Sequence, residues 1–198
     1  MRLVLASKTQ PPEALAAAYA TGARDFGENY VREAIAKRAA LTHLADARWH
    51  MIGHLQSNKA RVAVENFDLV HTLDGTRLAT ALSRARSSPP MPVLIEVNLG
   101  GEASKSGVSP DAVEALIDSS CGLVEVRGLM TIPPPAESPL AAHRWFAQLH
   151  ALRDRLTTAT GLALTELSMG MTDDYEAAIE EGATIVRVGR AVFGERLR

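Results

Sequence analysis

The chain has 198 residues, 46% of them hydrophobic, which is enough for one substantial core, so we expect residues 1–198 to form a single domain. The formal net charge is -2, which argues against a nucleic-acid partner, since such proteins carry a basic surface. Without an apolar run near the ~20 residues of a membrane span, and without a visible secretory signal, we expect no membrane partner and a cytoplasmic location. The single cysteine, Cys121, excludes an intramolecular disulfide.

The first apolar run begins at Leu3 and leads directly to Lys8. It is too short for a core helix and lacks helical period, so it predicts a buried parallel strand. Pro11 and Pro12 end the strand and open the next helix. Lys8 therefore lies at the carboxyl end of the strand, either as an ordinary solvated lysine or as a nucleophilic amine at the mouth of an α/β fold.

The rest of the chain alternates between short apolar runs and helical segments. Further strands are predicted at residues 23–26, 49–53, 69–73, 93–98, 124–130, 167–169 and 185–189. Helices are predicted at residues 12–20, 30–41, 60–65, 75–86, 110–119 (with Ser109 as N-cap), 140–158 and 173–181, with a short turn at 191–193. The strands are continuous apolar runs, which is typical of a parallel sheet buried on both faces.

Eight strand-helix units with short connections predict a (β/α)8 TIM barrel. Two units also look alike, because Gly22 and Gly182 each end a helix just before a strand. An open doubly wound sheet is the alternative, but no Gly-x-Gly-x-x-Gly follows the first strand. The chain is at the short end of the range for such barrels, whose lower limit is about 200 residues.

Polar residues follow the carboxyl ends of the predicted strands, where barrels carry their chemistry. They are Lys8, Glu28, Asn29, His54, Thr72, Asp74, Asn98, Thr131, Ser168, Gly170, Gly189 and Arg190. The loops at Ser168 and Gly189 occupy the usual phosphate-binding positions of a barrel. No metal site is predicted, because His50 and His54 are separated by a strand and a turn.

A lysine amine beside a phosphate cradle indicates either a Schiff-base aldolase or a protein that holds pyridoxal phosphate (PLP). Arg187 lies two residues before Gly189, so both face the barrel interior. A buried arginine needs a partner. The sequence leaves two open: the ring nitrogen of PLP, or a core salt bridge with Glu96 or Glu125.

Several motifs together resemble the PLP homeostasis proteins, also called the YggS or proline-synthase co-transcribed family. In chain order they are Ala6-Ser7-Lys8-Thr9, Phe26-Gly27-Glu28-Asn29-Tyr30, Trp49-His50-Met51-Ile52-Gly53-His54-Leu55-Gln56-Ser57-Asn58-Lys59, Ser104-Lys105-Ser106-Gly107, Arg127-Gly128-Leu129-Met130-Thr131-Ile132-Pro133, Ser168-Met169-Gly170-Met171 and Arg187-Val188-Gly189. The resemblance covers essentially the whole chain. It implies a barrel like the alanine racemase N-terminal domain, PLP as cofactor, and a role in vitamin B6 homeostasis without an established catalytic activity.

The resemblance also implies roles for single residues. Lys8 would carry PLP as a Schiff base, and Arg187 would face its ring nitrogen. Asn29 and Met51 would line the ring pocket. The phosphate would lie on Ser168 and the loop of Gly189 and Arg190.

The chain departs from the family in three places. A further N-terminal helix that members usually carry before the first strand is missing. Gln10 stands where many members have a second lysine, so a role of that lysine in PLP handling does not carry over. Arg190 stands where threonine or serine is common, and it would either add a cation to the phosphate or point to solvent.

The physical chemistry favours holding PLP over reacting with it. An arginine keeps its proton, so a ring nitrogen facing Arg187 stays unprotonated and the cofactor is a weak electron sink. Only Tyr30 and Tyr175 could replace the second acid-base group of a racemase, and both are better explained as packing residues. We therefore expect a monomeric PLP carrier that supplies PLP-dependent apo-enzymes, with Lys105 as a solvated loop residue; the alternative is a PLP-dependent racemase or decarboxylase of narrow scope.

Overall fold

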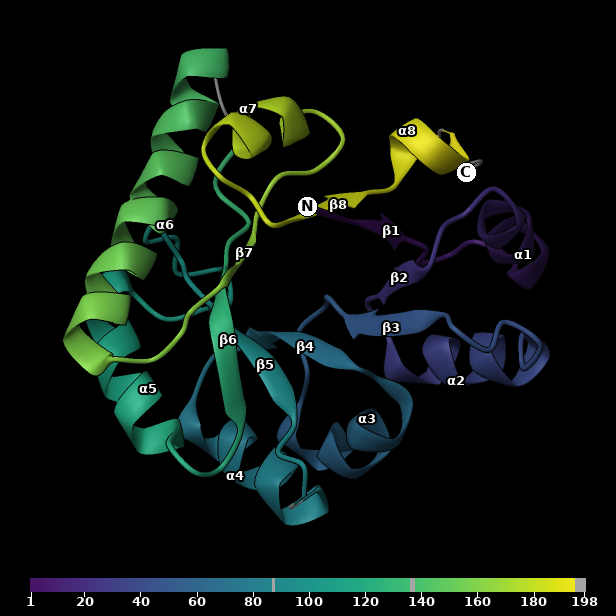
Figure 1. Cartoon of the computed structure of the whole chain (residues 1–198), viewed down its shortest axis with the longest axis horizontal. Coiled ribbons are helices and arrows are strands. Elements are labelled where there is room, and N and C mark those ends of the chain that lie inside the picture. The colour runs from purple at the N-terminus through teal and green to yellow at the C-terminus, as the bar shows by residue number, and fades with distance from the viewer. Residues whose placement is uncertain (87, 136–137, 195–198) are drawn as a thin grey trace.

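The protein is described here by a computed structural model, which covers residues 1–86, 88–135 and 138–194. Eight parallel strands close into a barrel in the order of the chain, β1 to β8. Figure 1 looks along the barrel, with the strands around the centre and the helices outside them. None of the helices within these ranges is long and apolar enough to cross a membrane.

The predicted (β/α)8 architecture is confirmed, and the open doubly wound alternative is wrong. The strands are β1 (Arg2–Ala6), β2 (Asp25–Glu28), β3 (Arg48–Met51), β4 (Leu69–Leu73), β5 (Pro92–Glu96), β6 (Glu125–Met130), β7 (Glu166–Ser168) and β8 (Ile185–Val188). The α-helices are α1 (Pro12–Ala20), α2 (Val31–Ala40), α3 (Ala60–Asn66), α4 (Thr76–Ala85), α5 (Val113–Ser120), α6 (Pro139–Thr160), α7 (Tyr175–Glu180) and α8 (Arg190–Phe193), and the 3-10 helices are η1 (Ser57–Lys59) and η2 (Pro110–Ala112).

Two element boundaries differ from the prediction for reasons visible in the hydrogen bonds. Strand β2 begins at Asp25 because the amide of Ala23 still donates to Ala18 O at the end of α1. The segment after Ser109 opens as η2, where Ala112 N donates to Ser109 O, and the Ser109 side chain makes no cap hydrogen bond.

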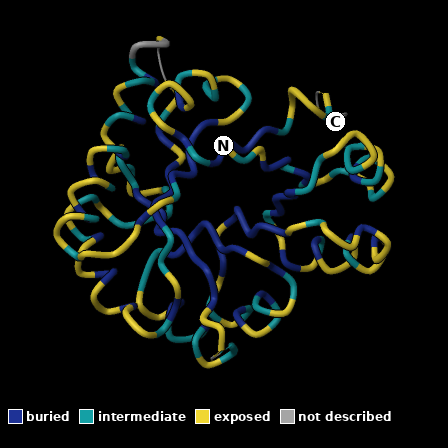
Figure 2. The backbone as a smooth tube through the Cα atoms, viewed as in Figure 1, coloured by how far each residue is buried: buried dark blue, intermediate teal, exposed yellow. Residues whose placement is uncertain are grey.

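The core has two parts, one inside the barrel and one between the barrel and the helices. The inner cluster comes from five strands around the closed sheet and contains Val4, Leu69, Leu94, Met130 and Ile185. The outer cluster packs the opposite strand faces against the helices, as expected when side chains alternate along a strand. Figure 2 shows the buried strands inside and the exposed helix faces outside.

A buried lysine of α2 holds the backbone that follows β1. Lys37 Nζ donates to Ser7 O at 2.6 Å and to Glu28 Oε1 at 2.7 Å. The same Glu28 oxygen accepts a hydrogen bond from Ser7 Oγ at 2.6 Å. Burial raises the pKa of Glu28 even though Lys37 and Ser7 favour its charged form. Glu28, Lys37 and Ser7 are all buried, so water does not substitute for these contacts.

The other side of Lys8 is held by the same cluster. Glu33 pairs with Lys37 at 2.7 Å and accepts from the amide of Thr9 at 2.5 Å. Thr9 has a φ of 66°, a left-handed conformation that an L side chain adopts only under constraint. The residues on both sides of Lys8 are therefore fixed by one ionic cluster at the start of the barrel.

Lys37→Met should destabilise the protein by about 3 kcal/mol or more, because it leaves Glu28 buried without its cation. Equilibrium unfolding in urea measures this change. Arg61→Met is the matched control, since Arg61 forms an exposed pair with Glu65 at 3.9 Å and should lose less than about 1 kcal/mol. Equal losses for the two variants would show that the buried cluster does not hold this end of the barrel.

Candidate functional site

The carboxyl ends of the strands bring Lys8 and the loop after β8 to the same part of the barrel mouth. Strands β1 and β8 are neighbours, with Leu5 opposite Val188. Gly189 lies against the end of β1, where a Cβ atom would stand 3.3 Å from Ala6 O. Lys8 is half-buried and follows β1 by two residues.

A cavity of about 240 Å³ lies at the mouth, over the ends of β2 to β5. Asn29, Ile52, Glu96 and Lys105 are among its lining residues. Asn29 Oδ1 and Glu96 Oε2 are buried and have no hydrogen-bond partner among the described residues. Buried polar atoms are normally satisfied, so two unsatisfied oxygens on one cavity indicate a place for a polar ligand.

Glu96 gives this cavity a carboxyl group that titrates near neutral pH. Burial raises its pKa to about 7, and the negative charge of Asp74 acts in the same direction. Arg187 and His54 oppose the shift. The group is neutral below that pH and adds a negative charge to the cavity above it.

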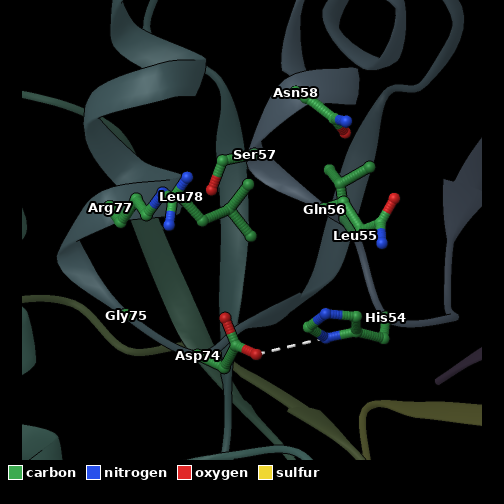
Figure 3. A pocket seen from close by; sticks show the side chains of 9 residues that line it. All are labelled: His54, Leu55, Gln56, Ser57, Asn58, Asp74, Gly75, Arg77 and Leu78. Atoms are coloured by element: carbon green, nitrogen blue, oxygen red, sulfur yellow. Dashed lines mark ion pairs between the residues drawn. The ribbon is translucent and has the colours of Figure 1, made fainter.

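A second cavity, of about 510 Å³, lies beside the first and shares His54 with it. It is formed by the segment after β3 and the start of α4, where His54 Nδ1 lies 3.2 Å from Asp74 Oδ2 (Figure 3). The predicted separation of His50 from His54 is confirmed, because His50 is buried while the His54 side chain is half-exposed.

Met51 is corrected by the structure, which places Ile52 on the cavity instead. Met51 belongs to the outer cluster with Phe26 and Trp49, between the strands and the helices. Its neighbour His50 points into the barrel, and side chains alternate, so Met51 must point outward. A continuous apolar run does not reveal which of its residues face inward, which explains the error.

Arg187 and Ser168 meet inside the barrel. Arg187 Nη1 donates to Ser168 Oγ at 2.5 Å, and its Nη2 donates to Thr131 O at 2.9 Å. Burial lowers the pKa of Arg187 to about 10, against the opposing effect of Glu96. The salt bridge with Glu96 or Glu125 is not formed within the described part of the chain. A phosphate contact by Ser168 stays a prediction, and its side chain is fully buried.

Two cations whose roles the sequence left open are engaged in ion pairs. Arg190 pairs with Asp173, which connects the loop after β8 to the loop after β7. Lys105 pairs with Glu102 at 2.6 Å at the edge of the smaller cavity. Lys105 is therefore a lining residue, and Arg190 is held in place beside Gly189.

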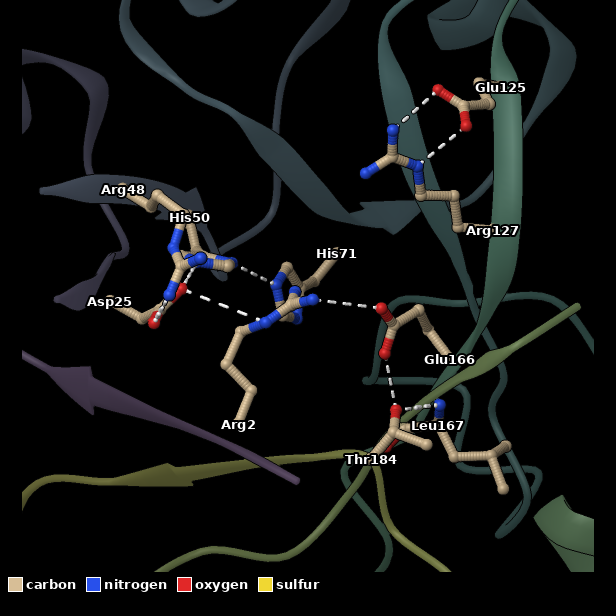
Figure 4. A network of polar contacts seen from close by, with 10 residues as sticks. All are labelled: Arg2, Asp25, Arg48, His50, His71, Glu125, Arg127, Glu166, Leu167 and Thr184. Atoms are coloured by element: carbon tan, nitrogen blue, oxygen red, sulfur yellow. Dashed lines mark hydrogen bonds and ion pairs between the residues drawn. The ribbon is translucent and has the colours of Figure 1, made fainter. Parts of the chain in front are cut away.

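Sequence reasoning missed a buried polar group behind Arg187, made of Asp25, His50 and His71. His50 Nε2 lies 2.9 Å from Asp25 Oδ1, and His50 Nδ1 lies 3.0 Å from His71 Nε2 (Figure 4). His71 Nδ1 lies 2.9 Å from Ser168 Oγ. The available signal was a histidine inside each of two otherwise apolar strands, which is unusual for a buried position.

Comparison with known proteins agrees with this geometry. Residues 5–197 match the family described as alanine racemase, N-terminal domain. The pyridoxal phosphate homeostasis protein of Pseudomonas aeruginosa is 48% identical over 198 residues, which cover 98% of this chain and 84% of that protein. The protein of the same name from Aquifex aeolicus is 45% identical over 199 residues, covering 98% and 87%.

A solved structure is similar over nearly the same length. PipY of Synechococcus elongatus, with PLP bound, superimposes with a TM-score of 0.91 at 42% sequence identity, covering 98% of this chain and 92% of that one. The (β/α)8 barrel, the arrangement of its mouth and these relatives agree. This chain belongs to the pyridoxal phosphate homeostasis protein family.

Proposed function

We propose that this protein binds PLP, holds it as a Schiff base on Lys8, and acts in the cytoplasm as a carrier or reservoir that supplies PLP-dependent apo-enzymes. The observation that carries the proposal is the placement of Lys8 beside Gly189 at a barrel mouth, in a chain related to PLP homeostasis proteins. The PLP bound to PipY supports it.

The chain's own residues fit this cofactor. Lys8 would supply the amine, with its backbone fixed on both sides. Asn29 offers an amide whose oxygen has no partner among the described residues, and Ile52 offers an apolar face for the ring. The phosphate would lie at Ser168, Gly189 and Arg190. When bound, PLP supplies an aldehyde that accepts an amine and a ring that withdraws electrons.

Arg187 limits what the ring can do. Even with its lowered pKa of about 10, Arg187 stays protonated at neutral pH, so it donates to a ring nitrogen and does not protonate it. Tyr30 is 62% exposed, and Tyr175 packs partly buried against the outer cluster. These positions favour the carrier function. One observation favours a PLP-dependent racemase or decarboxylase instead: Glu96 could serve as an acid-base group in the cavity.

Lys8→Ala should abolish the absorption band of the Schiff base while leaving weaker PLP binding through the phosphate loops. Absorption spectra and equilibrium dialysis with PLP measure the two effects separately. Lys105→Ala is the matched control, because Lys105 lines the cavity, and it should keep the band. A band that survives Lys8→Ala and disappears in Lys105→Ala would move the Schiff base to Lys105.

Glu96→Gln should remove part of the pH dependence of PLP binding. The Glu96 carboxyl is neutral below pH 7 and anionic above it, so it repels the PLP phosphate only at the higher pH. The ratio of wild-type to Glu96→Gln dissociation constants should therefore be close to one at pH 6 and rise severalfold by pH 8.5. A constant ratio over this range would show that Glu96 does not face the bound cofactor.

The carrier and enzyme functions are separated by turnover. Purified PLP-loaded protein should exchange the α-proton of amino acids no faster than free PLP does, as followed by NMR in deuterated water over a panel of amino acids. It should also restore activity to a PLP-dependent apo-enzyme across a small excess of free-PLP scavenger. Fast exchange that Glu96→Gln eliminates would establish the enzyme instead.

A further inference from the structure

Five buried polar side chains form one hydrogen-bonded chain across the inside of the barrel. In order, they are Asp25 of β2, His50 of β3, His71 of β4, Ser168 of β7 and Arg187 of β8. The four successive contacts measure 2.9, 3.0, 2.9 and 2.5 Å. None of the five residues is more than 4% exposed, so water does not replace any of these contacts.

The two ends of this chain have fixed roles. Arg187 can only donate. Burial raises the pKa of Asp25, but hydrogen bonds from His50 and Arg48 outweigh burial and leave the pKa below its ordinary value. Asp25 is therefore a carboxylate that can only accept. The middle of the chain must connect a pure donor to a pure acceptor.

This requirement assigns every proton. Burial, with His50 and Arg187 nearby, holds the pKa of His71 well below its ordinary value, so His71 is neutral, with one donor and one acceptor nitrogen. With His50 Nε2 donating to Asp25, His50 Nδ1 accepts from His71 Nε2. His71 Nδ1 then accepts from the Ser168 hydroxyl, whose oxygen accepts from Arg187. The reverse order needs a second proton on His50 and leaves the Ser168 hydrogen without an acceptor among the described residues.

We propose that Asp25 is the remote counter-ion of Arg187 and that His50, His71 and Ser168 carry its influence across the barrel. Arg187 forms no ion pair of its own within the described residues, and hydrogen bonds in series polarise one another. Resting on the proposed function, the inference makes Asp25, His50 and His71 positioning residues for the arginine at the cofactor ring.

The far end of the chain is accessible from the opposite mouth of the barrel. Asp25 pairs there with Arg48 at 2.6 Å, and Arg2 approaches it at 4.0 Å (Figure 4). The Arg48 side chain is 55% exposed, so its replacement leaves the core intact. Arg127 offers a matched control, because it also pairs with a carboxylate, Glu125, at 2.8 Å, but does not touch the chain.

Nitrogen-15 NMR of the histidine rings tests the chain without any cofactor. In the wild-type protein, His50 and His71 should each be neutral, with the proton on Nε2. Asp25→Asn keeps an acceptor for His50 but removes the charge, so the single tautomer should be lost. Arg48→Gln should shift the same ring resonances and Arg127→Gln should not. A doubly protonated His50, or protons on Nδ1, would overturn the proposed order.

The effect on the cofactor is read from PLP labelled with nitrogen-15 in its ring. Asp25→Asn and Arg48→Gln should each shift the ring-nitrogen resonance, and Arg127→Gln should leave it in place. Bound PLP with an unchanged resonance in both variants would overturn the remote counter-ion while leaving the proposed function intact. If Asp25→Asn does not fold, Arg48→Gln decides. The assigned tautomers without any PLP binding would sink the proposed function and support the chain.

Discussion

The structure depends most on a guanidinium placed inside a closed barrel. Arg187 is 3% exposed and keeps its proton, so the interior must supply polar partners for a charge that water cannot reach. The barrel does so with Ser168, the carbonyl of Thr131 and the histidines behind Ser168. The inner apolar cluster occupies the remaining space. An interior with a polar stripe beside an apolar cluster therefore follows from one buried cation.

A second buried charge supports the site from outside the barrel. Lys37 reaches from α2 to the carbonyl before Lys8, while Glu33 holds the amide after it. Lys37 and Arg187 lie on opposite sides of the strand wall, one behind the backbone of the amine and the other beneath the mouth. Both act on ring and amine through fixed geometry, which suits a protein that holds a cofactor tightly and reacts little with it.

The fold was predictable from the sequence because it depends on local patterns. Continuous apolar strands, helix-ending glycines such as Gly22 and the count of eight units specify a parallel barrel. Lys8 and Gly189 could be placed on the same rim because parallel strands share their direction. What the pattern lacks is the phase of each strand, so Met51 was exchanged for Ile52.

The buried chain could not be predicted for a different reason. His71 and Ser168 are 97 residues apart and meet only because the barrel closes. Local spacing carries no information on which inward side chains face each other across the interior. The same holds for Glu96, whose pKa of about 7 arises from burial and from Asp74 on another strand connection.

Borohydride reduction of the PLP-loaded protein, followed by peptide mapping, tests the central claim most directly. The chain contains four lysines, Lys8, Lys37, Lys59 and Lys105, so the map has few possible answers. The account predicts a single reduced PLP adduct on the peptide that contains Lys8. An adduct on Lys105 or another lysine, or no adduct in protein that still retains PLP, would contradict it.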